Sequence, residues 1–119
     1  MKTRLIAISS MATRRLLADL AADCTRCSGH VLAVQSVGGG DSARRVQAGE
    51  GFDVVVLASD AIDKLIASGR LVARSKVDLV HSPVAIAVRA DALQPDVGSE
   101  EAVKQAVLAA RSLCCSTGP

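Results

Sequence analysis

The stretch VLAVQSVGGGDSARRVQA, residues 31–48, decides the fold that we expect for this chain. It begins with an extended apolar run, Val31–Val37, and ends with a run of helical character, Asp41–Ala48. The glycines Gly38-Gly39-Gly40 stand between the two runs and favour a tight turn that a ligand can approach closely. Because the amides that open a helix are unpaired, such a strand-to-helix corner can hold an anion.

The same order of strand and helix occurs on either side of this corner. Thr3–Ile8 predicts a short buried strand, and Ala12–Asp23 a helix with leucines at helical spacing. Asp53–Leu57 is apolar and β-branched, which is typical of a central parallel strand, and Asp60–Ala67 predicts the next helix. This alternation predicts an α/β fold: a three-layer, doubly wound sheet.

We expect the alternation of strand and helix to continue in the last third of the chain. Pro83 precedes Val84–Val88, which predicts a fourth strand, and Ala102–Ala110 predicts a fourth helix. Leu113–Cys115 would begin a fifth strand, followed by a turn at the end of the chain. We therefore expect residues 1–119 to form a single α/β lobe.

Composition excludes several classes of function. Half of the 119 residues are hydrophobic and Phe52 is the only aromatic one, so the core is built from aliphatic side chains. A nucleic-acid surface that stacks bases is not expected without aromatic residues, and a net charge of +2 is weak evidence for a polyanion partner. No apolar run approaches the roughly 18–20 residues that span a bilayer, so membrane insertion is not expected.

The cysteines and histidines suggest no catalytic or metal centre. Cys24-Thr25-Arg26-Cys27 has redox-motif spacing but closes a helix, whereas a thioredoxin-type motif opens one. The adjacent Cys114-Cys115 does not form a second zinc-ligand pair, and neither His30 nor His81 lies in a triad pattern. We therefore expect the cysteines to be small apolar filler. We expect no catalytic residues, no metal, no cofactor and no enzymatic activity. The alternative in which the chain is an enzyme is a thiol oxidoreductase.

Three strand ends carry small or polar residues, and each leads into a helix. They are Ser9-Ser10, Gly38-Gly39-Gly40 and Ala58-Ser59-Asp60. Since ligands of open α/β sheets bind beyond the carboxyl ends of the strands, these corners predict one anion site built from neutral donors. The alternative is that they are ordinary turns and caps, where the same residue types are favoured.

With the corners placed, the chain resembles the first half of a periplasmic substrate-binding protein of the molybdate-binding type. The resemblance is most specific over residues 43–57, ARRVQAGEGFDVVVL, which are similar to that family's helix, glycine turn and strand. It implies a type II binding-protein fold, in which two lobes clamp an oxyanion. The implied ligand contacts are Ser10 or Ser9, the corner at Gly38 and Gly39, and the backbone near Ala58.

The resemblance implies a solute-binding lobe for a small oxyanion such as molybdate, which feeds an ABC importer and contacts its permease. Serines of that family are replaced here by glycines, and the second lobe is missing after residues 113–119, where the crossover to it would begin. An edge exposed by this truncation implies a homodimer. The resemblance implies a periplasmic location; a chain complete as written would be cytoplasmic. The alternative function is a cytoplasmic ligand-sensing or interaction module of the same fold.

Overall fold

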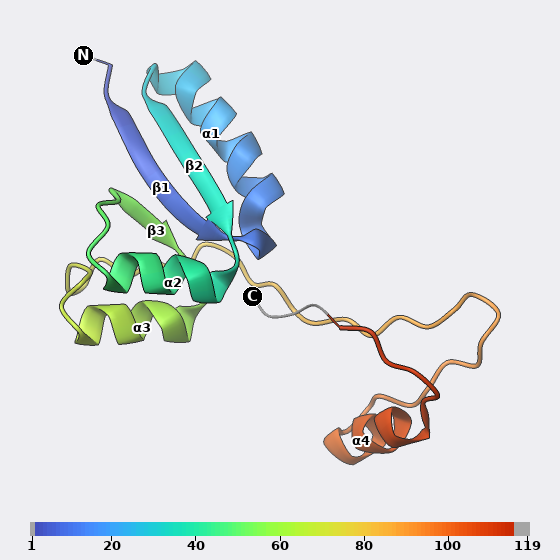
Figure 1. The fold of residues 1–119 in the computed structure, drawn as a ribbon. Helices are drawn as coiled ribbons and strands as arrows, with labels where there is room; N and C mark the ends of the chain where they lie inside the picture. Colours follow the sequence, from blue (N-terminus) through green and yellow to red (C-terminus); the bar gives the residue numbers. More distant parts are fainter. Residues whose placement is uncertain (1, 116–119) are drawn as a thin grey trace. The chain divides into compact units, whose positions relative to one another are not determined.

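The computed structural model describes residues 2–115. Its elements in chain order are β1 (Arg4–Ser10), the 3-10 helix η1 (Met11–Thr13), α1 (Arg14–Ser28), β2 (Val31–Val37), α2 (Gly39–Gln47), β3 (Val54–Val56), α3 (Ser59–Ala67) and α4 (Glu100–Ala109). They fall into two compact units that divide after His81. The first unit holds the strands and the first three α-helices, and the second holds α4 (Figure 1).

The first unit is a small parallel sheet in the order β2-β1-β3. The central strand is β1, whose Ala7 and Ile8 are 1% and 0% exposed. The third strand predicted over Asp53–Leu57 is confirmed as the shorter β3, Val54–Val56, but its predicted central position is wrong, because β3 pairs only with β1 among the described residues. An apolar sequence shows that a strand is partly buried, but it does not say which strands are its neighbours.

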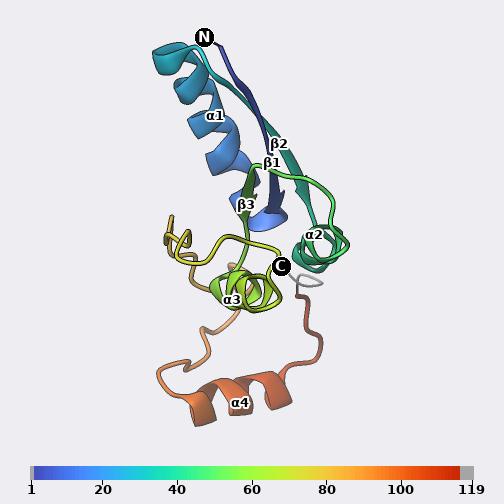
Figure 2. The ribbon, with the colours of Figure 1, turned by 90° about the vertical axis from the view of Figure 1, so that its left-hand side faces the viewer.

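Helices cover both faces of this sheet. Figure 2 shows α1 and α2 on opposite sides of the strands. On the side of α2, Ile8 of β1, Val46 of α2 and Leu65 of α3 form the core, with Phe52 and Val55 packed against them. Full burial of one such aliphatic side chain contributes about 1.5–3 kcal/mol. The α/β class is thus confirmed, while a complete doubly wound sheet stays a prediction.

The helix predicted over Ala12–Asp23 begins as η1 and continues as α1, which extends beyond the predicted end to Ser28. It ends where Gly29 adopts a left-handed conformation, with φ of 73°, and donates its amide to the carbonyl of Thr25 at 2.9 Å. Glycine adopts this conformation without steric cost, which makes it a frequent helix terminator. Gly29 is therefore the residue that ends α1.

The second unit contains a helix without a sheet. Helix α4 confirms the predicted fourth helix, and Ser99 caps it by accepting the amide of Ala102 at 3.1 Å. The predicted strands Val84–Val88 and Leu113–Cys115 are wrong: neither segment has regular secondary structure. Val84 is 97% exposed, and a strand needs a partner for its backbone groups, which the described part of this unit does not offer. The predicted terminal turn lies outside the described residues, and the single-lobe division stays a prediction.

Asp53 joins the beginning of β3 to the central strand. Its amide donates to the carbonyl of Ile6, and its carboxylate accepts the amide of Ile6, both at 2.8 Å. The side chain thus takes the place of a backbone acceptor at the edge of the ladder. This contact fixes the register between β1 and β3 at the point where the loop enters the sheet.

We expect Asp53→Ala to lower the free energy of unfolding by about 1 kcal/mol, because the amide of Ile6 loses a charged acceptor. Asp53→Asn should lose less, since the amide oxygen can still accept. Urea unfolding followed by circular dichroism measures both. Asp23→Ala is the control, because Asp23 makes only an exposed ion pair with Arg26. Equal losses of unfolding free energy in Asp53→Ala and Asp23→Ala would contradict the role of Asp53 as acceptor for the amide of Ile6.

Candidate functional site

The parallel register brings the predicted corners to one edge of the sheet. Ser10 is aligned with Val37, so β1 and β2 end at the same level, and Ser9 is aligned with Val56 of β3. Gly38 directly follows Val37, and Ala58 lies two residues beyond Val56. The predicted contacts Ser9, Ser10, Gly38, Gly39 and Ala58 therefore all lie at the carboxyl edge. Their role as ligand contacts stays a prediction.

Each of these corners opens a helix without a side-chain cap. Ser10, Gly38 and Ala58 are the N-cap residues of η1, α2 and α3, with extended backbone and ψ values of 163°, 143° and 145°. None of the three caps its helix through a side-chain hydrogen bond. The first amides of a helix have no partner inside the helix, so an uncapped start leaves them for water or a ligand.

The glycine corner does not need glycine for its backbone shape. Gly38 has φ of −53°, which any residue adopts, whereas the glycines with positive φ are Gly29, Gly49 and Gly69. A Cβ added at Gly40 would meet no atom within 4 Å. The expectation that these glycines serve a tight turn is therefore wrong. The glycines instead leave the exposed backbone at Gly38 and Gly40 without side chains, while Gly39 between them is buried.

The two serines at the end of β1 have different surroundings. Ser9 is 0% exposed, and its hydroxyl lies 2.7 Å from the hydroxyl of Ser36 on β2. Ser10 is 5% exposed and does not use its hydroxyl to cap η1. Because the hydroxyl of Ser9 is already engaged within the sheet, Ser10 is the better placed of the two to contact a ligand.

The sequence reasoning missed two hydroxyl groups near this edge. Gly38 is the N-cap residue of α2, and the buried hydroxyl of Ser42, four residues later, donates to the carbonyl of Ser9 at 3.0 Å. Thr13, at the end of η1, has a buried Oγ1 without a hydrogen-bond partner among the described residues. The sequence signal that could have indicated Thr13 was its position three residues after Ser10. No signal in the neighbouring sequence indicated the hydrogen bond that Ser42 makes.

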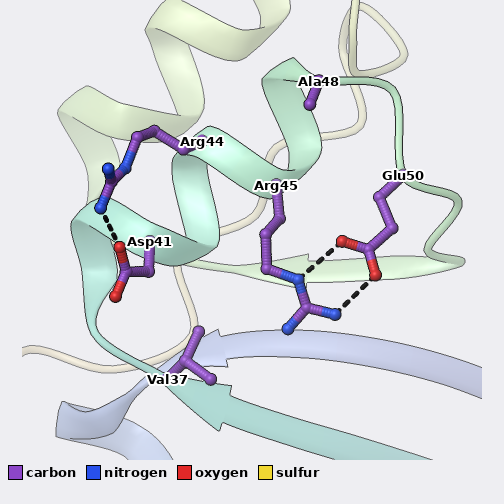
Figure 3. A pocket seen from close by; sticks show the side chains of 6 residues that line it. All are labelled: Val37, Asp41, Arg44, Arg45, Ala48 and Glu50. Carbon is purple, nitrogen blue, oxygen red and sulfur yellow. Dashed lines mark hydrogen bonds and ion pairs between the residues drawn. The ribbon is translucent and has the colours of Figure 1, made fainter.

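An open hollow of about 480 Å³ lies beside α2, between the end of β2 and the loop that follows α2. Figure 3 shows its lining residues, Val37, Asp41, Arg44, Arg45, Ala48 and Glu50. The guanidinium of Arg45 donates to both carboxylate oxygens of Glu50 at 2.6 Å, and Arg44 pairs with Asp41 (Figure 3). Each charged side chain in the hollow thus has an opposite charge beside it, which makes the hollow a weak candidate for an anion site.

The pair of Arg45 and Glu50 holds the loop between α2 and β3. Arg45 also donates to Gln35 at 3.0 Å and lies over the ring of Phe52, 5.3 Å from its centroid. The hydrogen bond from Arg45 lowers the pKa of Glu50 below its ordinary value of 4.5, against the opposing effect of desolvation. The same bond raises the pKa of Arg45, so both groups carry their charges at neutral pH.

The cysteines and histidines do not join the site. Cys24 and Cys27 lie exposed in the last turns of α1, and Cys114 and Cys115 are also exposed, so the expectation of apolar core filler is wrong. His30 accepts the amide of Thr3 at 3.1 Å through Nδ1, which is a structural contact. Within residues 2–115, no group of three or more His, Cys, Asp or Glu side chains is arranged to hold a metal ion.

The sign of the Glu50 shift predicts an acid dependence of stability. Because the pKa of Glu50 is lower in the folded chain, its contribution is present above the ordinary carboxyl pKa and is lost as the pH falls through the lowered value. We expect wild type to lose more stability than Glu50→Gln on acidification from neutral pH through this range. Urea midpoints at a series of pH values measure this, with Glu101→Gln as the control. A Glu50→Gln variant with the wild-type acid slope would refute the link.

Comparison with known proteins adds a family and a relative. A family model described as "Bacterial extracellular solute-binding protein" matches residues 5–115. The aconitate isomerase of a Pseudomonas species is 36% identical in an alignment that covers 96% of this chain and 45% of that protein. The chain therefore spans less than half the length of this relative. No solved structure matches the chain.

This relative corrects one expectation from the sequence. A protein that is 36% identical carries the name of an enzyme, which contradicts the expectation that the chain has no enzymatic role. The expectation rested on nucleophiles, triads and metal ligands, which are recognisable as sequence patterns. A wall of backbone amides and hydroxyls leaves no such pattern and can also belong to an enzyme.

Proposed function

The chain belongs to the bacterial extracellular solute-binding proteins, and from this premise we propose that its first unit forms one wall of a binding site for a small organic anion. The observation that supports the proposal is the carboxyl edge of the sheet, where three uncapped helix starts follow three parallel strands. Unpaired amides and the helix dipole both favour a negative group at such a place.

The wall binds through neutral donors in this proposal. Gly38 and Gly40, at the beginning of α2, are exposed and carry no side chains, while Gly39 between them is buried, and the hydroxyl of Ser10 lies at the end of the neighbouring strand. The arginines of α2 are held in ion pairs with Asp41 and Glu50. A charge-assisted hydrogen bond from an amide to an anion is stronger than one between neutral groups, so cationic side chains are not required.

We infer that the anion is aconitate or a similar tricarboxylate. The support is the name of the relative that is 36% identical to the chain. Each carboxylate of such a ligand accepts several hydrogen bonds, which suits clustered amides. In this proposal the chain binds and orients the substrate as part of a protein that isomerises aconitate.

A tetrahedral oxyanion such as molybdate is the second candidate. The donor set favours it to the same degree, since hydroxyls and helix amides bind oxyanions as readily as carboxylates. With such a ligand the function would be delivery to an ABC importer, with its permease as partner.

The family is one of extracellular proteins, which supports a periplasmic or extracellular location for either function. None of the helices in residues 2–115 is long and apolar enough to cross a membrane.

Titration calorimetry of the chain with cis-aconitate, molybdate and sulfate tests the proposal through a pair of glycine variants. Gly40→Ala adds a methyl group beside the opening amides of α2 without meeting any protein atom. It should raise the melting temperature slightly, because alanine favours the helix by about 0.5–1 kcal/mol over glycine, and yet weaken anion binding. Stability and affinity would then change in opposite directions.

Gly51→Ala is the matched control, since its added Cβ also meets nothing and Gly51 lies in the loop between α2 and β3. We expect its affinity to equal that of wild type. Binding of cis-aconitate that Gly40→Ala leaves unchanged would place the site elsewhere. Absence of heat with every anion up to millimolar concentration would refute the proposed function for this chain, and binding of molybdate alone would favour the second candidate.

A further inference from the structure

Ser42 ties the glycine corner to the central strand. Its hydroxyl donates to the carbonyl of Ser9 at the end of β1, at 3.0 Å, and its amide donates to the carbonyl of Gly38 at 2.8 Å. Both Ser42 and Ser9 are 0% exposed. One residue therefore closes the first turn of α2 and, through its side chain, attaches that turn to the strand beneath it.

A second hydrogen bond extends this attachment to the neighbouring strand. The hydroxyl of Ser9 lies 2.7 Å from the hydroxyl of Ser36, which is its register partner on β2. Two residues after Ser36 the chain reaches Gly38 and turns into α2. The ends of β1 and β2 and the beginning of α2 are thus joined by two contacts between serines, in a region closed to solvent at Ser9 and Ser42.

The apolar core holds α2 at a different point. Val46, one turn after Ser42, is 5% exposed and packs in the core with Ile8 and Leu65. Packing of this kind is non-directional, so it keeps the helix on the sheet without fixing where its first amides point. A hydrogen bond is directional, and the bond from Ser42 acts on the turn that presents those amides.

We propose that Ser42 is a positioning residue of the anion site: it fixes the opening amides of α2, at Gly39 and Gly40, relative to Ser10 on the neighbouring strand end. The inference rests on the proposed function for its binding consequence. It goes beyond that function by assigning the geometry of the wall to a buried hydroxyl that does not touch the ligand. Glycines are the most conformationally free residues, so a corner made of them depends on such an anchor.

The test compares Ser42→Ala with Val46→Ala in the 119-residue chain. We expect Ser42→Ala to weaken binding of cis-aconitate about tenfold, because the variant loses one hydrogen bond that holds the opening turn of α2 in position. Backbone ¹⁵N relaxation should show larger motion at the amides of Gly39 and Gly40. Val46→Ala should lower the urea midpoint at least as much, since it opens a cavity in the core, while its affinity measured on folded protein stays within about twofold of wild type.

Ser42→Cys provides a graded variant, because a thiol fills the site but is a weaker donor. Its affinity and amide motion should fall between those of wild type and Ser42→Ala, which also tests the inference if the alanine variant does not fold. Unchanged motion at Gly39 and Gly40, or unchanged affinity in a folded Ser42 variant, would overturn the inference. If wild type binds no anion, the proposed function fails, and the relaxation data still decide whether Ser42 fixes the corner.

Discussion

Parallel pairing on both sides of β1 is the constraint on which the rest of the structure depends. It buries Ala7 and Ile8 at the centre of the first unit and sets the ends of the three strands at one edge. Because each strand leads into a helix, the same pairing gathers three helix starts at that edge. The packing that stabilises the unit and the polar edge that we propose as a binding wall therefore have a common origin.

Local sequence was sufficient where a boundary depends on neighbouring residues. The limits of β2, Val31–Val37, agree with the prediction because an apolar run is followed at once by glycines. It was insufficient where the outcome depends on distant partners. Asp53–Leu57 has the composition of a central strand but lies beside β1 at an edge of the described sheet, and Val84–Val88 has high strand propensity without a partner to pair with.

The candidate site shows the same division. Its general position followed from strand polarity, since the carboxyl ends of parallel strands must meet. The roles of individual residues did not follow, because the hydroxyl of Ser42 bonds a carbonyl 33 positions earlier and the hydroxyl of Ser9 turns to Ser36. The reason given for the glycines also changed. Their backbone angles are ordinary, so what they contribute is the absence of side chains at the exposed positions Gly38 and Gly40.

The most direct measurement of the central claim is amide chemical-shift mapping of the chain during titration with cis-aconitate. The account predicts that the largest shifts occur at Ser10, Gly39, Gly40 and Ser59, the residues at and just beyond the carboxyl edge. The competing surface is the hollow between the end of β2 and the loop after α2, where Arg45 and Glu50 form an ion pair. Shifts confined to Arg44, Arg45 and Glu50, with none at the glycine corner, would contradict the account.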